Sequence, residues 1–77
     1  MINIQILNFS LKNLEYLRDI KRKDADCKFI FIFNESNKNF LTISSKAGLD
    51  DYLIEPYTKI DLEKKITKLS ENNTPSF

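Results

Sequence analysis

The chain has no histidine, no tryptophan, one cysteine and one glycine among its 77 residues. Without histidine, a Ser-His-Asp triad cannot form and a zinc site loses its usual nitrogen ligand. The lone Cys27 excludes an internal disulfide and a CxxC redox pair, and we interpret it as an ordinary small residue before a strand. One glycine is too few for a glycine-rich phosphate loop. We therefore predict a protein that is not an enzyme and that binds no metal and no cofactor.

No excess of one charge and no long apolar run is present either. Twelve basic residues stand against eleven acidic ones, for a net charge of +1. Proteins that bind DNA or RNA usually concentrate positive charge on one face. The only basic run spans Lys21 to Lys23, and aspartates surround it at Asp19, Asp24 and Asp26. We predict no nucleic-acid partner, no membrane contact and, in the absence of a signal peptide, a cytoplasmic location.

The hydrophobic spacing changes repeatedly along the chain, which predicts strands alternating with helices. Apolar residues at every second position predict a strand over Ile2 to Leu7. Leucine and isoleucine residues at helical spacing then predict a helix that ends in the polar run 21–26, with Ser10 and Asn13 as candidate caps. The unbroken run Phe29 to Phe33 is typical of a parallel strand that is covered on both faces.

The second half of the chain repeats this alternation. An apolar stripe over Phe40, Leu41, Ile43 and Ala47 predicts a weak helix, and Gly48 suits the left-handed position at its C-terminus.

A short strand over residues 52–54 stops at Pro56. Thr58 and Asp61 resemble a capping box for a final helix with its core stripe on Leu62, Ile66 and Leu69. We predict one domain over residues 1–70 and a flexible tail over 71–77. The predicted fold class of the domain is α/β, with the order β-α-β-α-β-α and a three-stranded parallel sheet.

The segment Ala47 to Tyr57, AGLDDYLIEPY, closely resembles the pattern AGADDYLxKPF of response-regulator receiver (CheY-like) domains. That resemblance implies a flavodoxin-like sheet with strand order 2-1-3-4-5. This chain would supply only the third, fourth and fifth strands, so it resembles the C-terminal half of a receiver domain.

The resemblance also locates the family's phosphorylation chemistry on this chain. The phosphoryl-accepting aspartate falls on Asn8, or on Gln5 in an ungapped match. The hydroxyl residue falls on Phe33, or on Asn34 if the turn shifts, and the conserved lysine falls on Glu55. The Mg²⁺-binding acidic pair would lie in the missing half. None of these side chains can perform the role of the family residue whose position it occupies, so we predict a degenerate site.

Other positions have simpler interpretations. Tyr52 occupies the family's aromatic switch position, although we favour the simpler interpretation of a strand tyrosine whose ring packs and whose hydroxyl reaches water. Pro56 keeps the proline that often follows a cis bond in the family. Asn8 and Glu55 are expected to approach each other and form a hydrogen bond. Adjacent Asp50 and Asp51 are interpreted as a solvated turn that offsets nearby lysines.

The missing half would leave the Ile2 to Leu7 strand as an open edge, with Ile2, Ile4 and Ile6 and no lysine or proline to block pairing. We expect a homodimer in which two such strands pair antiparallel about a twofold axis, extending the sheet to six strands. A complementing chain that carries the first two strands is an alternative, in which this chain is the detached half of a phosphorylatable receiver. A decayed product without function is a third. We predict a non-catalytic pseudo-receiver, with a signalling protein as a further partner at the Phe40 to Leu69 surface.

Overall fold

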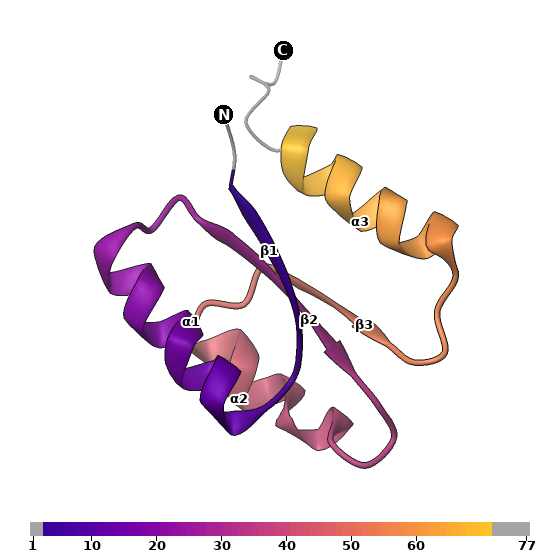
Figure 1. The fold of residues 1–77 in the computed structure, drawn as a ribbon, viewed down its shortest axis with the longest axis horizontal. Coiled ribbons are helices and arrows are strands. Elements are labelled where there is room, and N and C mark those ends of the chain that lie inside the picture. The colour runs from indigo at the N-terminus through magenta and orange to yellow at the C-terminus, as the bar shows by residue number, and fades with distance from the viewer. Residues whose placement is uncertain (1–2, 72–77) are drawn as a thin grey trace.

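The computed structural model describes residues 3–71 and shows three parallel strands, each followed by a helix (Figure 1). The elements are β1 (Ile4–Asn8), α1 (Leu11–Lys23), β2 (Lys28–Phe33), the 3-10 turn η1 (Lys38–Phe40), α2 (Leu41–Lys46), β3 (Asp51–Ile54) and α3 (Lys59–Glu71). The predicted α/β class and the β-α-β-α-β-α order are confirmed. The arrangement is consistent with part of a flavodoxin-like fold.

The sheet has the order β1-β2-β3, so β2 is its central strand. In register, Ile6 of β1 pairs with Ile30, and Leu53 of β3 pairs with Ile32. The first strand does not end at Leu7 as expected, because its ladder with β2 continues until the Phe9 N–H donates to the Ile32 carbonyl oxygen at 2.8 Å. Ile2 lies outside the described residues.

One face of the sheet carries the main core. Alternate residues of β2 point to this face, where three phenylalanines and Cys27 pack with Leu14 and Leu17 of α1. Phe29 and Phe31 are fully buried. Helix α2 closes the same cluster through Leu41, and Figure 1 shows α1 and α2 near each other, with α3 apart from both. The expectation that β2 is covered on both faces holds except at Ile32, which is half-buried.

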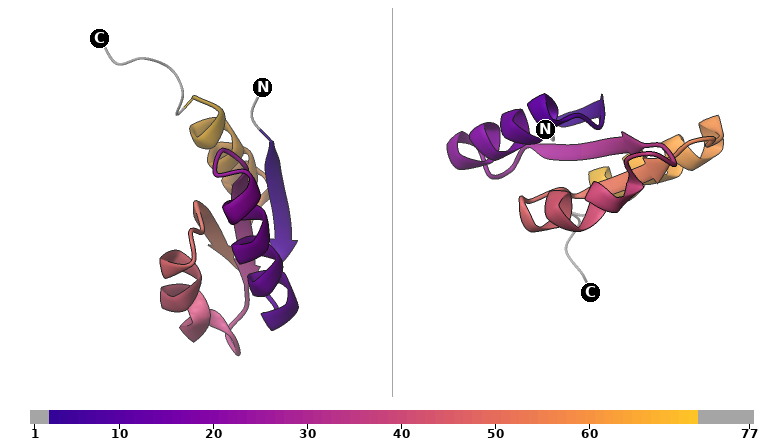
Figure 2. Two further views of the ribbon diagram at one scale, coloured as in Figure 1. Left: turned by 90° about the vertical axis from the view of Figure 1, so that its left-hand side faces the viewer. Right: turned by 90° about the horizontal axis from the view of Figure 1, so that it is seen from below.

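Among the elements of residues 3–71, α3 alone covers the opposite face, and it packs mainly against β3. Ile30 and Leu53 are buried on this face, together with Leu69 of the helix. Two further views show that α3 lies on the β3 side of the sheet (Figure 2). Ile6 of β1 remains 36% exposed because no element covers that part of the sheet within residues 3–71.

Local signals in the sequence explain where the helices begin and end. The Ser10 hydroxyl accepts the Asn13 N–H at 2.9 Å and caps α1. Gly48 follows α2 with φ 114°, a left-handed conformation that glycine adopts without strain. At α3, the Thr58 and Asp61 side chains and N–H groups bond reciprocally at 3.1 Å, which confirms the capping box. The Glu55–Pro56 bond is cis.

Two predictions about helices were wrong in detail. The second helix begins with the 3-10 turn η1, and the tighter turn shifts the phase of the α2 residues that follow. As a result Ser44 is fully buried, whereas Ile43 of the predicted apolar stripe is 41% exposed. The last helix includes Glu71, which we had assigned to the tail. Residues 72–77 of that tail lie outside the described part of the chain.

Candidate functional site

The degenerate phosphorylation positions end the three strands at one edge of the sheet. Asn8 is the last residue of β1, Phe33 is the last of β2, and Glu55 follows β3 directly. The carboxyl ends of parallel strands form the usual ligand crevice of such folds. Here the three strand ends offer an amide, a phenyl ring and a carboxylate. This set contains neither a phosphoryl acceptor that would replace aspartate nor a positive charge.

The expected hydrogen bond between Asn8 and Glu55 is wrong. The central strand separates them, and two strand spacings amount to about 10 Å. The Asn8 carbonyl oxygen instead accepts the Asn13 side-chain amide at 2.7 Å, and the Glu55 N–H donates to the Phe33 carbonyl oxygen at 2.8 Å. Both Asn8 and Glu55 are exposed to solvent.

Aromatic packing fills the middle of this edge. Phe33 is 1% exposed and stacks on Phe9 with ring centroids 5.2 Å apart, and Phe9 stacks in turn on Phe40 at 5.0 Å. The alternative residue Asn34 stabilises its own turn, because its Oδ1 accepts the Ser36 N–H at 2.9 Å. The other alternative, Gln5, lies within β1 opposite Phe29, away from the carboxyl ends of the strands.

Asp50 and Asp51 do not form the solvated turn that we expected. Asp50 Oδ2 accepts both the Lys21 Nζ at 2.9 Å and the Phe29 backbone N–H at 2.8 Å, and its side chain is 18% exposed. Asp51 Oδ1 accepts the Lys65 Nζ at 2.9 Å. The two carboxylates do offset lysines, and Asp50 also links α1 to the start of β2. Nothing in the sequence spacing indicated that link, because its partners lie 29 and 21 residues away.

Tyr52 is a partly exposed strand tyrosine. Its ring meets Phe33 edge-on at 6.5 Å, and Lys65 Nζ lies 5.3 Å from its centroid. The side chain is 38% exposed. These contacts match the simple packing interpretation, in which the ring rests on the sheet and reaches water.

Cys27 lies in the main core and is 1% exposed. Burial raises the pKa of its thiol, and the charge of Asp24 raises that pKa further. A protonated, buried thiol is a poor nucleophile and a poor metal ligand. Residues 3–71 contain no group of three or more side chains arranged to hold a metal ion.

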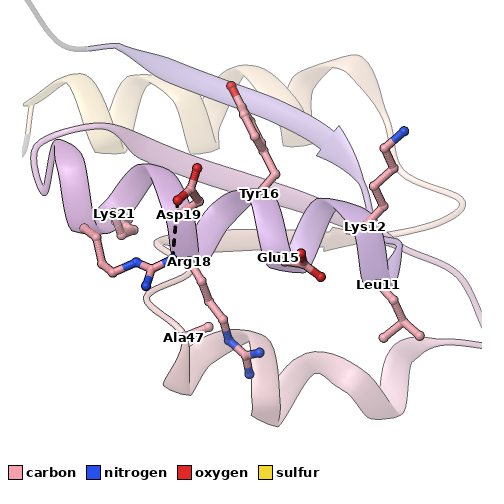
Figure 3. A pocket seen from close by; sticks show the side chains of 9 residues that line it. Leu11, Lys12, Glu15, Tyr16, Arg18, Asp19, Lys21 and Ala47 are labelled. Carbon is pink, nitrogen blue, oxygen red and sulfur yellow. Dashed lines mark hydrogen bonds and ion pairs between the residues drawn. The ribbon is translucent and has the colours of Figure 1, made fainter.

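A groove of about 880 Å³ runs along the solvent side of α1 toward Ala47 (Figure 3). Charges of both signs line it, and Arg22 pairs with Asp19 at 3.3 Å. In Figure 3, Arg18 points toward α2, whereas Tyr16 points toward the β1 side of the helix. Mixed charges on an open surface favour no particular ligand. No helix within the described residues is long and apolar enough to cross a membrane.

The outer edge of β1 is the remaining candidate. Within residues 3–71, β1 pairs only with β2. At its two ends the Lys28 N–H donates to the Asn3 carbonyl oxygen, and the Phe9 N–H donates to Ile32, both at 2.8 Å. In a parallel ladder alternate residues bond to one neighbour, so the N–H and C=O groups of Ile4 and Ile6 face outward.

The sequence of β1, Ile-Gln-Ile-Leu-Asn, contains no charge and no proline. Natural sheets use such residues to block edge pairing, and this edge lacks them. The candidate site is therefore an unblocked strand edge beside the exposed side chain of Ile6.

No protein-family model matches this sequence, and no curated protein matches it either. The likeness to receiver domains accordingly rests on the residues of the Ala47 to Tyr57 segment and stays a prediction.

Proposed function

We propose that this chain is a non-catalytic, cytoplasmic pseudo-receiver module that associates with a second copy of itself through β1. The observation that carries the proposal is the unblocked outer edge of β1. Within residues 3–71 no strand lies beside this edge, so the outward backbone groups of Ile4 and Ile6 keep their hydrogen-bonding capacity. Strand addition satisfies those groups and covers Ile6 at the same time.

The chemistry of the strand ends supports a role without catalysis. A receiver needs a carboxylate to accept the phosphoryl group and cations to neutralise it. Asn8 provides an amide, and Glu55 places a negative charge where the resemblance requires a lysine. Phe33 with its aromatic neighbours occupies the space between them. A phosphoryl group at this edge would meet repulsion rather than stabilisation.

Light scattering after size-exclusion chromatography tests the association over at least a tenfold range of concentration. The wild-type chain, of 9.1 kDa, is expected at twice that mass. Ile6→Lys is expected to be monomeric, because a buried lysine at the junction would lack a partner charge. The matched control is Ile60→Lys. The side chain of Ile60 is 61% exposed and belongs to α3, the helix that packs mainly against β3.

Two results would contradict the proposal. One is a wild-type monomer at every concentration. The other is equal dissociation by Ile6→Lys and Ile60→Lys, since that would place the contact elsewhere. Circular dichroism of each variant establishes that it is folded, so that loss of association is not loss of structure.

The absence of catalysis is tested separately by incubation with acetyl phosphate and Mg²⁺. The intact mass is expected to stay unchanged with the wild-type dimer. A gain equal to one phosphoryl group would instead support the alternative of a detached, phosphorylatable half-receiver.

A further inference from the structure

We propose that two copies pair through β1 in one antiparallel register, with Gln5 of each copy on the twofold axis and helix α1 forming a second layer of the interface. This inference rests on the proposed association through β1. It adds the relative direction of the copies, the residues that face each other and a further element in contact.

The outward backbone groups define the register. In an antiparallel ladder, residues that point their N–H and C=O toward the partner form pairs that exchange two hydrogen bonds. Within the described residues, Ile4 and Ile6 are the outward-facing residues of β1 whose backbone groups are not already bonded by a side chain. Pairing Ile4 with Ile6 of the partner subunit, and the reverse, uses both of them. Gln5 then faces its own symmetry mate in the intervening pair without backbone bonds.

Asn13 disfavours the neighbouring register. A twofold axis at Ile6 would pair Ile4 with Asn8 and would need the Asn8 carbonyl oxygen as an acceptor. The Asn13 side-chain amide already donates to that oxygen at 2.7 Å and lies at the same outer edge. A partner strand there would have to share the acceptor and displace the amide. In the register centred on Gln5, the two pairs between Ile4 and Ile6 do not use this oxygen.

The charges of β1 and α1 permit a second copy, and geometry favours the antiparallel direction. Strand β1 carries no charge, so two copies meet without repulsion. The last turn of α1 is basic, with Lys21, Arg22 and Lys23. Antiparallel copies place the two basic turns at opposite ends of a helix pair about 20 Å long, since 13 residues rise about 1.5 Å each. Two copies that joined the same edges in parallel would instead carry their α1 helices on opposite faces of the sheet, so that no helix pair could form.

Helix α1 supplies area that the short strand lacks. It packs over both strands, because Leu14 and Leu17 share a core cluster with Leu7 of β1 and Phe31 of β2. A helix centred between strands about 4.8 Å apart would lie about 10 Å from its symmetry mate, a normal helix-packing distance. Tyr16 is 41% exposed and points toward the β1 side of α1, so it faces this second layer (Figure 3).

Cysteine cross-linking tests the register on the full chain. Opposed residues without backbone bonds approach closely enough for a disulfide, whereas diagonal neighbours about 7–8 Å apart do not. Gln5→Cys is therefore expected to form a disulfide-linked dimer with oxidised glutathione. Ile6→Cys is expected to remain largely unlinked under the same conditions. Wild type, whose Cys27 is buried, gives the background. Leu11→Cys, 65% exposed, reports random collisions.

The outcomes separate the two proposals. A dimer by light scattering under reducing conditions, together with Gln5→Cys linking faster than Leu11→Cys, supports the register. A dimer in which Ile6→Cys links and Gln5→Cys does not overturns the register and leaves the association through β1 in place. A dimer in which neither links also overturns the register. A monomeric wild-type chain overturns both.

For the second layer, Tyr16→Ala is expected to raise the dimer dissociation constant, and an unchanged constant removes α1 from the interface.

Discussion

The two faces of the sheet carry similar apolar residues but are covered to different degrees. On the α1 and α2 face, Phe29, Phe31 and Phe33 are buried among side chains from two helices. On the α3 face, one helix buries Ile30, while Ile6 remains exposed. Strand composition alone does not distinguish Ile6 from Ile30, which are register partners. The difference shows that burial in a small α/β domain depends on how many helices reach each strand.

The comparison also explains why the candidate site lies at β1. Helix α3 packs mainly against β3, on the far side of the central strand from β1. The exposed face and the open backbone edge therefore coincide on one strand. Either feature alone is common on protein surfaces, but their combination suits strand addition.

The largest expected effect separates the two faces directly. Phe31→Ala removes a fully buried ring from the two-helix face and should lower the free energy of unfolding by about 3–5 kcal/mol. In a domain this small, that loss leaves much of the chain unfolded. Ile6→Ala on the other face should cost less than about 1 kcal/mol in the monomer, because the side chain is already partly hydrated. Urea unfolding measures both losses, at a protein concentration low enough that light scattering shows only monomer. Equal losses would break the comparison.

An intermediate effect is expected at Asp50, whose carboxylate joins α1 to the start of β2. Asp50→Ala leaves the Phe29 N–H without its carboxylate acceptor and Lys21 without its partner, which should cost about 1–3 kcal/mol. The matched control is Asp19→Ala, whose exposed ion pair with Arg22 should contribute less than about 0.5 kcal/mol. Both are measured by urea unfolding. A loss at Asp19 as large as that at Asp50 would argue against the structural role of Asp50.

The smallest effect concerns the cap of α3, the only helix on the thinly covered face within residues 3–71. Hydrogen bonds from the Thr58 N–H and hydroxyl lower the pKa of the Asp61 carboxyl. A lowered folded-state pKa means that the ionised group stabilises the fold above its ordinary pKa of 3.8, and that this contribution disappears as the pH falls through the lower, folded-state value. Asp61→Asn should therefore melt below wild type at neutral pH, and the gap should close in acid. Thermal melts from neutral pH to pH 2.5 measure it, and a gap that widens in acid would contradict the assignment.

Sequence spacing predicted the elements whose signals are local. The Phe29 to Phe33 run, the capping box at Thr58 and the glycine after α2 each depend on neighbours within a few residues, and all three were correct. The phase of α2 was missed because the preceding 3-10 turn is not visible in apolar spacing. The approach of Asn8 to Glu55 was wrong because it was carried over from a family geometry rather than from strand spacing.

The sequence by itself determined the alternation of strands and helices, the parallel sheet and the absence of histidine, glycine-rich loops and paired cysteines, because these follow from composition and periodicity. Only the tertiary structure decided that Asp50 joins α1 to β2, that Asn13 caps the Asn8 carbonyl, and that the outward groups of β1 belong to Ile4 and Ile6. Each of these depends on residues far apart in the chain or on which side of a strand faces its neighbour. That information arises when the strands pair, because pairing fixes which backbone groups are used and which remain free.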